Sequence, residues 1–118
     1  MLPEDDRVRL QHMLDAARKA VRLAAGGRRE ALDDEDDPLA DALVRLISVI
    51  GEAASKVSSG TCLELDEIPW PDVVGMRNRL VHAYFDINLD ILWATVQYSL
   101  PPLIRLLESA LAEDGASS

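Results

Sequence analysis

The segment from Pro38 to about Ser58 constrains the fold most, because its apolar residues recur in alternating steps of four and three. These residues are Leu39, Leu43, Leu46, Ile50, Ala53 and Val57. The spacing places them on one stripe of an α-helix, a narrow seam that packs along another helix. Val44 and Ile47 widen the seam towards a second face. The helix is therefore predicted to have more than one neighbour, as at the centre of a bundle or at a subunit interface.

Two other segments show the same periodicity. One runs from about Glu4 to Ala25 and stops at Gly26-Gly27, a pair suited to a helix C-terminus. The other runs from about Asn88, a candidate N-cap, to Ala112. Pro101-Pro102 interrupts its hydrogen bonds and predicts a kink or two abutting helices. The small polar tail at 113–118 is expected to fray.

A short helix is predicted from Pro71, since proline suits the first helical position. Its buried side would consist of Val73, Met76, Leu80 and Val81. The stretch before it, from Ser58 to Trp70, reads as a loop with at most one turn of its own. Because strand-like alternation of useful length is absent from the sequence, the predicted fold is all-α. We expect one domain over 1–118, an up-and-down bundle of four main helices with the short helix set against it.

Charge limits what the chain can bind. The net charge is −9, from 21 acidic and 12 basic side chains. This is the wrong sign for holding nucleic acid on a broad basic face, so DNA is not expected as a partner and any RNA contact must be local, or assisted. Six of the eight residues from Glu30 to Asp37 are acidic. We interpret about 28–37 as a solvated, mobile loop; the alternative is an acidic arm that docks a basic partner or repels RNA.

Membrane and metal chemistry have little support in the sequence. No apolar run approaches the ~20 residues that span a bilayer, and the acidic N-terminus does not resemble a signal peptide. A soluble, cytoplasmic protein is expected. The single Cys62 cannot form an internal disulfide, and two histidines offer no zinc spacing. We therefore expect no metal and no cofactor.

Most of the reactive chemistry is concentrated between Gly75 and Asp86, which include Arg77, His82 and Tyr84. A histidine exchanges protons near neutral pH, and an arginine fork fits a phosphate. On a regular helix His82 would lie about 140° around from Arg77, so one straight helix would not present both to one phosphate. Either the helix loosens before Tyr84, or the site combines two chains.

The spacing Arg77, four residues, then His82-Ala83-Tyr84 resembles the R-x4-H-x-Y signature of HEPN ribonuclease toxins of the HepT type. These are the helical partners of small MNT nucleotidyltransferase antitoxins. The resemblance covers about Asp6 to about Leu111. Its further landmarks are Ile50-Gly51-Glu52-Ala53-Ala54, Glu67-Ile68-Pro69-Trp70, Tyr84-Phe85-Asp86 and Leu100-Pro101-Pro102-Leu103.

The resemblance implies a metal-independent endoribonuclease toxin that cleaves RNA by attack of the 2′-hydroxyl. It implies a homodimer whose signature segments face each other across a twofold axis. His82 would transfer protons and Arg77 would hold the phosphate, with Asn78 and Glu52 as accessory residues. Tyr84 would be the residue that the MNT antitoxin adenylylates, and the added group would exclude RNA by volume and charge.

Other interpretations remain open. The chain could be a catalytically silent helical module that binds a nucleotide or a nucleotidyltransferase partner, which would suit its acidic balance. It could also serve only as a substrate that its partner modifies at Tyr84. His12 and Arg79 are interpreted as solvated surface residues outside the site.

Overall fold

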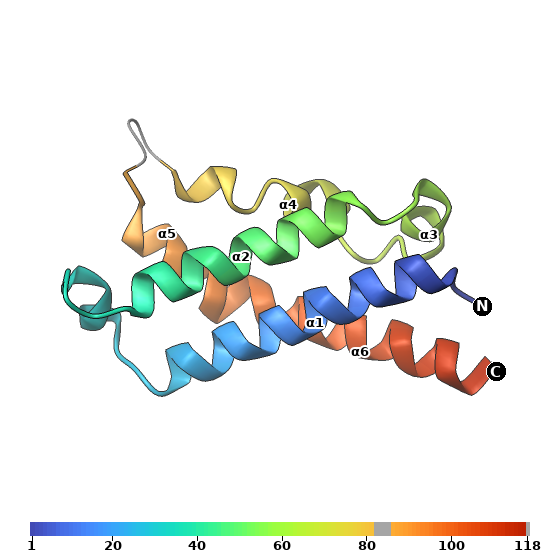
Figure 1. Cartoon of the computed structure of the whole chain (residues 1–118), viewed down its shortest axis with the longest axis horizontal. Helices are drawn as coiled ribbons and strands as arrows, with labels where there is room; N and C mark the ends of the chain where they lie inside the picture. The colour runs from blue at the N-terminus through green and yellow to red at the C-terminus, as the bar shows by residue number, and fades with distance from the viewer. Residues whose placement is uncertain (82–85, 118) are drawn as a thin grey trace.

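The computed structural model describes residues 1–81 and 86–117, and its regular elements there are helical apart from one isolated β-bridge. The long helix α1 (Glu4–Ala25) runs along most of the molecule and α2 (Leu39–Ser55) returns beside it (Figure 1). The last helix, α6 (Leu100–Ser117), brings the C-terminal end back beside the N-terminus. The predicted all-α bundle is confirmed. None of the described helices is long and apolar enough to cross a lipid bilayer.

The core lies between α1, α2 and α6. Leu43, Ile47 and Ile50 of α2 are fully buried, as are Leu10 and Met13 of α1. Burying each such side chain contributes roughly 1.5–3 kcal/mol. The predicted seam of α2 is confirmed at Leu43 and Ile50, whereas Leu39 and Leu46 are half-buried and Val57 lies beyond the end of the helix. Ile47 on the second face is as buried as Leu43. The reason is that α2 packs against α1 on one side and against α4 (Trp70–Val74) and α5 (Leu89–Ala94) on another.

A glycine sets the distance between α2 and α4. Gly51 is buried, and a Cβ built on it would lie 3.2 Å from the carbonyl oxygen of Val74. That is tighter than most real Cβ contacts, and the obstacle is backbone rather than a flexible side chain. The two helices can therefore approach closely only because position 51 has no side chain.

The final helical stretch is interrupted just before Pro101, as predicted. Between α5 and α6, residues Thr95–Ser99 form a π-helical turn, η3, and the N–H of Leu100 donates to the carbonyl of Thr95. A proline ring clashes with the carbonyl four residues before it and supplies no N–H. The wider π turn makes room for the rings of Pro101 and Pro102 at the start of α6.

A buried carboxylate connects α1 to the helix α3 (Ser59–Glu64), which forms within the segment interpreted as a loop. Asp6 is only 4% exposed. Its oxygens accept hydrogen bonds from the hydroxyls of Ser58 and Thr61 and from the Ser58 N–H. The Ser58 and Thr61 hydroxyl bonds, in that order, outweigh burial and lower the pKa of Asp6. The charged side chain of Asp6 therefore helps to hold α1 against the start of α3.

The connecting segments are more ordered than the sequence indicated. Within the acidic run, Arg29–Asp33 forms a 3-10 helix, η1, whose Leu32 is 4% exposed and belongs to the core. The first half of this run is thus anchored, contrary to the expected mobile loop. The structure assigns the tail to α6 as far as Ser117, and the expected fraying of residues 113–118 stays a prediction.

Candidate functional site

The helix that leads into the signature is much shorter than predicted. The sequence pattern suggested that it continued as far as Val81, but α4 ends at Val74. Residues Asn78–Leu80 then form a separate 3-10 turn, η2, and Val81 is extended, with φ −93° and ψ 124°. The helix therefore ends before Tyr84, as the first of the two alternatives above requires; a site that combines two chains stays a prediction. The angle of about 140° computed for a straight helix does not apply to this segment.

Buried apolar residues determine which signature side chains face solvent. Met76 and Leu80 are 4% and 0% exposed, respectively, and hold the segment against the core. The residues between them, Arg77, Asn78 and Arg79, are all exposed. Burial of Met76 and Leu80 therefore holds this backbone against the core, and the three polar side chains between them face solvent.

The two signature arginines have different surroundings. Arg79 folds back onto α4: its Nη2 donates to the carbonyl oxygen of Asp72 at 2.7 Å, and its Nη1 lies 3.8 Å from the Asp72 carboxylate. Arg79 thus connects η2 to α4, a contact that the surface interpretation missed. Within residues 1–81 and 86–117, neither Arg77 nor Asn78 has a side-chain hydrogen bond or ion pair. The Arg77 guanidinium therefore remains available for an anion.

The backbone on both sides of the central signature residues is paired. Val81 forms an antiparallel bridge with Ile87, and the N–H of Asn88 donates to the carbonyl of Leu80 at 2.7 Å. The side chain of Asn88 accepts from the N–H of Ile91 at 3.0 Å, which confirms the predicted N-cap. These contacts join the end of η2 to the start of α5.

His82 and Tyr84, together with Ala83 and Phe85, lie outside the described residues. Their predicted roles in proton transfer and adenylylation stay predictions. Glu52 is exposed on α2, one residue after the Gly51 contact with α4. Among the residues described, no hydrogen bond or ion pair links Glu52 to Arg77 or Asn78, so its accessory role also stays a prediction.

The described residues offer no obvious metal site. They contain no group of three or more His, Cys, Asp or Glu side chains that could hold a metal ion. Burial, and to a smaller degree the charge of Asp6, raises the pKa of the Cys62 thiol, which makes this cysteine a poor nucleophile. Metal independence remains an expectation about the reaction.

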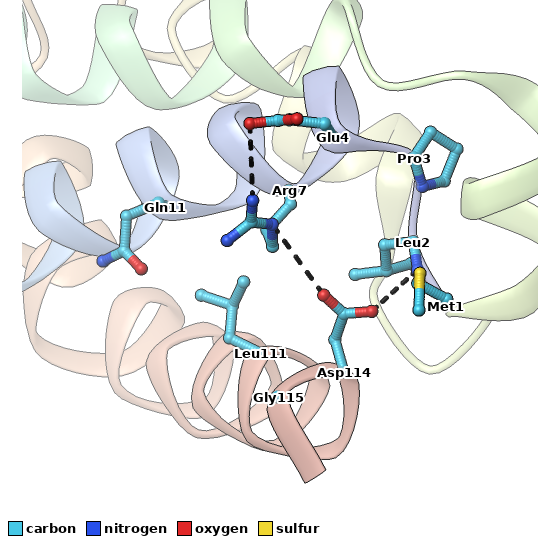
Figure 2. A pocket seen from close by; sticks show the side chains of 9 residues that line it. All are labelled: Met1, Leu2, Pro3, Glu4, Arg7, Gln11, Leu111, Asp114 and Gly115. Carbon is cyan, nitrogen blue, oxygen red and sulfur yellow. Dashed lines mark hydrogen bonds and ion pairs between the residues drawn. The ribbon is translucent and has the colours of Figure 1, made fainter. Parts of the chain in front are cut away.

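A hollow of about 750 Å³ opens where the two termini meet (Figure 2). Asp114 of α6 accepts a hydrogen bond from the Leu2 N–H at 2.7 Å and lies 3.9 Å from Nε of Arg7. These contacts join the ends of α1 and α6. No residue that lines the hollow belongs to the signature, so we do not place the ribonuclease site there.

Comparison with known proteins agrees with this arrangement. The family described as Ribonuclease HepT-like matches residues 13–110. The chain belongs to the HepT-like ribonuclease family. This membership confirms the predicted HEPN-type ribonuclease and the predicted enzyme class, an endoribonuclease. The matched range contains the entire signature, including Arg77 and residues 82–85, which the structure does not describe.

Individual relatives point the same way. A candidate RNase of Caldanaerobacter subterraneus subsp. tengcongensis is 30% identical over 89% of this chain and 93% of its own. A probable ribonuclease HepT of Thermococcus cleftensis is 37% identical over 52% of this chain. That match covers only 56% of the Thermococcus protein, so it compares a part of each molecule. No solved structure matches the chain at a comparable level of significance.

Proposed function

We propose that this HepT-like chain is the toxin component of a toxin–antitoxin pair, a homodimeric, metal-independent endoribonuclease that acts in the cytoplasm. The observation that carries the proposal is Arg77. Its side chain is exposed and has no partner within the described part of the chain, although Arg79 next to it is engaged. An arginine left available five residues before His82 matches a role in holding the phosphate of RNA.

The proposed reaction needs three groups. One accepts the proton of the 2′-hydroxyl as that oxygen attacks the phosphorus, one donates a proton to the departing 5′-oxygen, and one neutralises charge on the crowded phosphate. The products are a 2′,3′-cyclic phosphate and a free 5′-hydroxyl. One histidine cannot fill both proton roles at once. A site built from both protomers supplies His82 twice and Arg77 twice, and it requires no metal.

Regulation would act on the same segment. Transfer of an adenylyl group from ATP to the hydroxyl of Tyr84, with release of pyrophosphate, would add a bulky anion to the signature. Such a group competes with RNA for the same cations. An MNT-type nucleotidyltransferase is the partner proposed to carry out this transfer, and it would thereby act as the antitoxin.

The test is a cleavage assay on total RNA in the presence of EDTA. Removing a positioned acid or base costs ~10²–10⁴-fold in rate, so His82→Ala should nearly abolish cleavage while the dimer persists. His12→Ala is the matched control, because His12 is an exposed histidine on α1. Intact mass must first exclude a nucleotide on Tyr84. If His82→Ala cleaves RNA as fast as the parent, the assignment of His82 is wrong.

A silent binding module is the second candidate, and the charge favours it. With 21 acidic and 12 basic residues, the chain lacks the positive balance that usually holds RNA. In this case the signature would bind a nucleotide or the nucleotidyltransferase without cleaving RNA. Unmodified parent protein that leaves RNA intact under conditions where it binds a nucleotide would support this candidate over the ribonuclease.

A further inference from the structure

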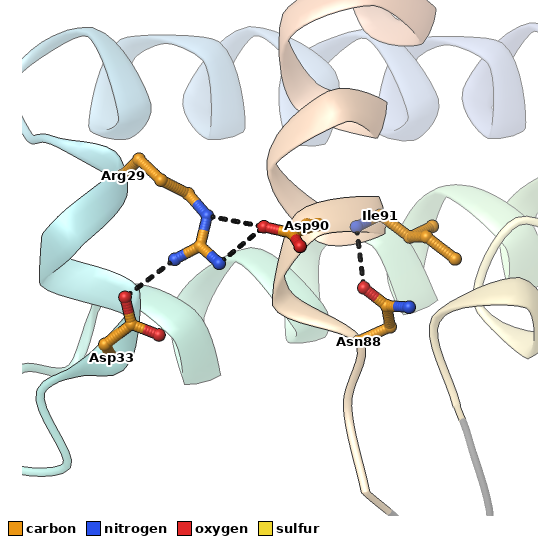
Figure 3. Close-up of polar contacts among 5 residues, drawn as sticks. All are labelled: Arg29, Asp33, Asn88, Asp90 and Ile91. Carbon is orange, nitrogen blue, oxygen red and sulfur yellow. Dashed lines mark hydrogen bonds and ion pairs between the residues drawn. The ribbon is translucent and has the colours of Figure 1, made fainter.

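Arg29 joins two elements that lie far apart in the sequence. Its Nη2 and Nε donate to Oδ1 of Asp90 at 2.7 Å and 3.2 Å, and its Nη1 donates to Oδ2 of Asp33 at 3.1 Å (Figure 3). Asp33 belongs to η1 and Asp90 to the first turn of α5. The hydrogen bond to Asp90 is the main cause that raises the pKa of Arg29. One cation thus connects two carboxylates.

The element that carries Arg29 is held in place. Leu32, three residues later, is 4% exposed and packs in the core, and η1 contacts both α2 and α5. Backbone hydrogen bonds from Ala31 to Arg28 and from Asp34 to Ala31 close the turn. Arg29 therefore reaches Asp90 from an anchored turn, which lowers the entropic cost of holding the contact.

The other end of the contact leads to the signature. Asp90 lies two residues after Asn88, whose N–H donates to the carbonyl of Leu80 and whose side chain caps α5. Ile87, directly before Asn88, pairs with Val81. In the sequence, Val81 directly precedes His82. A shift at the start of α5 would therefore move the backbone that enters and leaves the central signature residues.

We propose that Arg29 is a positioning residue of the ribonuclease: it fixes the start of α5 and thereby the paired backbone at Val81 and Ile87. The inference rests on the proposed function for its effect on catalysis. Asp90 has 87% of its side chain exposed, and Arg29 is its one hydrogen-bonding or ion-pairing partner among the described residues. Because exposed ion pairs contribute little to global stability, removing this one should alter geometry more than folding.

The experiment compares steady-state cleavage of a single-stranded RNA by the parent chain and by Arg29→Ala. We expect kcat to fall about three- to tenfold with little change in KM or in thermal midpoint, since residues outside a site typically modulate it by this order. Arg29→Lys should recover only part of the loss, because an ammonium cannot form the fork that joins two carboxylates. The double variant R29D/D90R should restore most of the lost kcat, because one cation again lies between two carboxylates.

The chain contains a matched control. Arg18 and Glu108 form an exposed ion pair at 2.5 Å that joins α1 to α6 across 90 residues, away from the signature. Arg18→Ala should leave kcat unchanged. The inference is wrong if Arg29→Ala cleaves at the parental rate, or if Arg18→Ala loses as much activity.

A second measurement separates this inference from the proposed function. Amide hydrogen exchange at Asn88 and Ile91 reports whether the start of α5 opens more often, and it requires no cleavage activity. Faster exchange in Arg29→Ala than in Arg18→Ala would support the positioning role even if the parent cleaved no RNA. Equal exchange rates in the two variants would overturn that role, whatever the parent did to RNA.

Discussion

Asp6 and Arg77 show two opposite uses of a charged side chain. Asp6 is 4% exposed and accepts three hydrogen bonds that connect α1 to the start of α3. Arg77 is exposed and, in the part of the chain described, has no hydrogen bond or ion pair. Burying a charge is costly unless its partners are present, so the chain satisfies Asp6 completely. Arg77 remains in water and is free to meet an external anion.

The difference separates stability from activity. A side chain that the fold uses internally should affect unfolding when it is removed. One that the fold leaves exposed should affect only what binds to it. Asp6 and Arg77 therefore make opposite predictions for two measurements, the rate of RNA cleavage and the free energy of unfolding.

Between Asp6 and Arg77, the larger expected effect is that of Arg77→Ala on cleavage. Removing a preorganised donor to a developing negative charge typically costs ~10²–10³-fold in kcat, which corresponds to about 2.7–4 kcal/mol. The free energy of unfolding should change by less than about 0.5 kcal/mol, as for ordinary surface substitutions. Arg79→Ala is the matched control, because Arg79 is also exposed but is bound to Asp72. If both variants lose the same amount of cleavage activity, Arg77 has no larger role in cleavage than Arg79, and the proposed role of Arg77 is wrong.

Asp6→Ala should have the reverse profile. The substitution leaves the hydroxyls of Ser58 and Thr61 without their acceptor, and losing one member of a buried polar network costs about 2–4 kcal/mol. Urea unfolding measures this loss, and Asp5→Ala, at an exposed position of the same turn, should lose much less. Cleavage by the fraction that remains folded should match the parent. A parental free energy of unfolding in Asp6→Ala would show that the cluster does not stabilise the fold.

Local patterns were sufficient to predict most of the fold. Helical spacing predicted α1 and α2, and at the start of α2 the side chain of Asp37 accepts from the Leu39 N–H at 2.9 Å. The missing N–H groups of Pro101 and Pro102 predicted the break before α6. These features depend on residues close in sequence, so one sequence reveals them. The link from Arg29 to Asp90 spans 61 residues and leaves no local pattern.

The sequence predicted candidate residues for the site, but it did not predict the backbone geometry of the segment that carries them. Met76 and Leu80 are four residues apart, a spacing that a regular helix would also bury, so the pattern could not distinguish a helix from a turn followed by η2. Gly75 is the C-cap of α4, and its N–H donates to the Pro71 carbonyl oxygen at 3.0 Å. The change from α4 to η2 becomes visible only in three dimensions.

Gly51→Ala tests the close contact between α2 and α4, the helix that leads to Arg77. Its effect on the free energy of unfolding should be smaller than that of Asp6→Ala. The new methyl group would lie 3.2 Å from the Val74 carbonyl oxygen, and overpacking of this kind typically costs about 1–3 kcal/mol. Gly60→Ala is the matched control, because no atom lies within 4 Å of the added Cβ. Inside α3 that change should stabilise slightly, by about 0.5–1 kcal/mol. If both variants unfold at the same urea concentration, the contact between α2 and α4 is looser than described.

The smallest effect concerns pH, and its sign follows from Asp6. Hydrogen bonds from the Ser58 and Thr61 hydroxyls hold the pKa of Asp6 below its ordinary value, so in acid the unfolded chain binds a proton before the folded one does. The resulting stabilisation is fully present above the unfolded pKa of about 4 and is lost as pH falls through the folded pKa. The parent's free energy of unfolding should therefore fall more steeply in this window than that of Asp6→Asn. One proton limits the difference in slope to about 1.4 kcal/mol per pH unit. Parallel curves for the two proteins would show that protonation of Asp6 is not what destabilises the fold in acid.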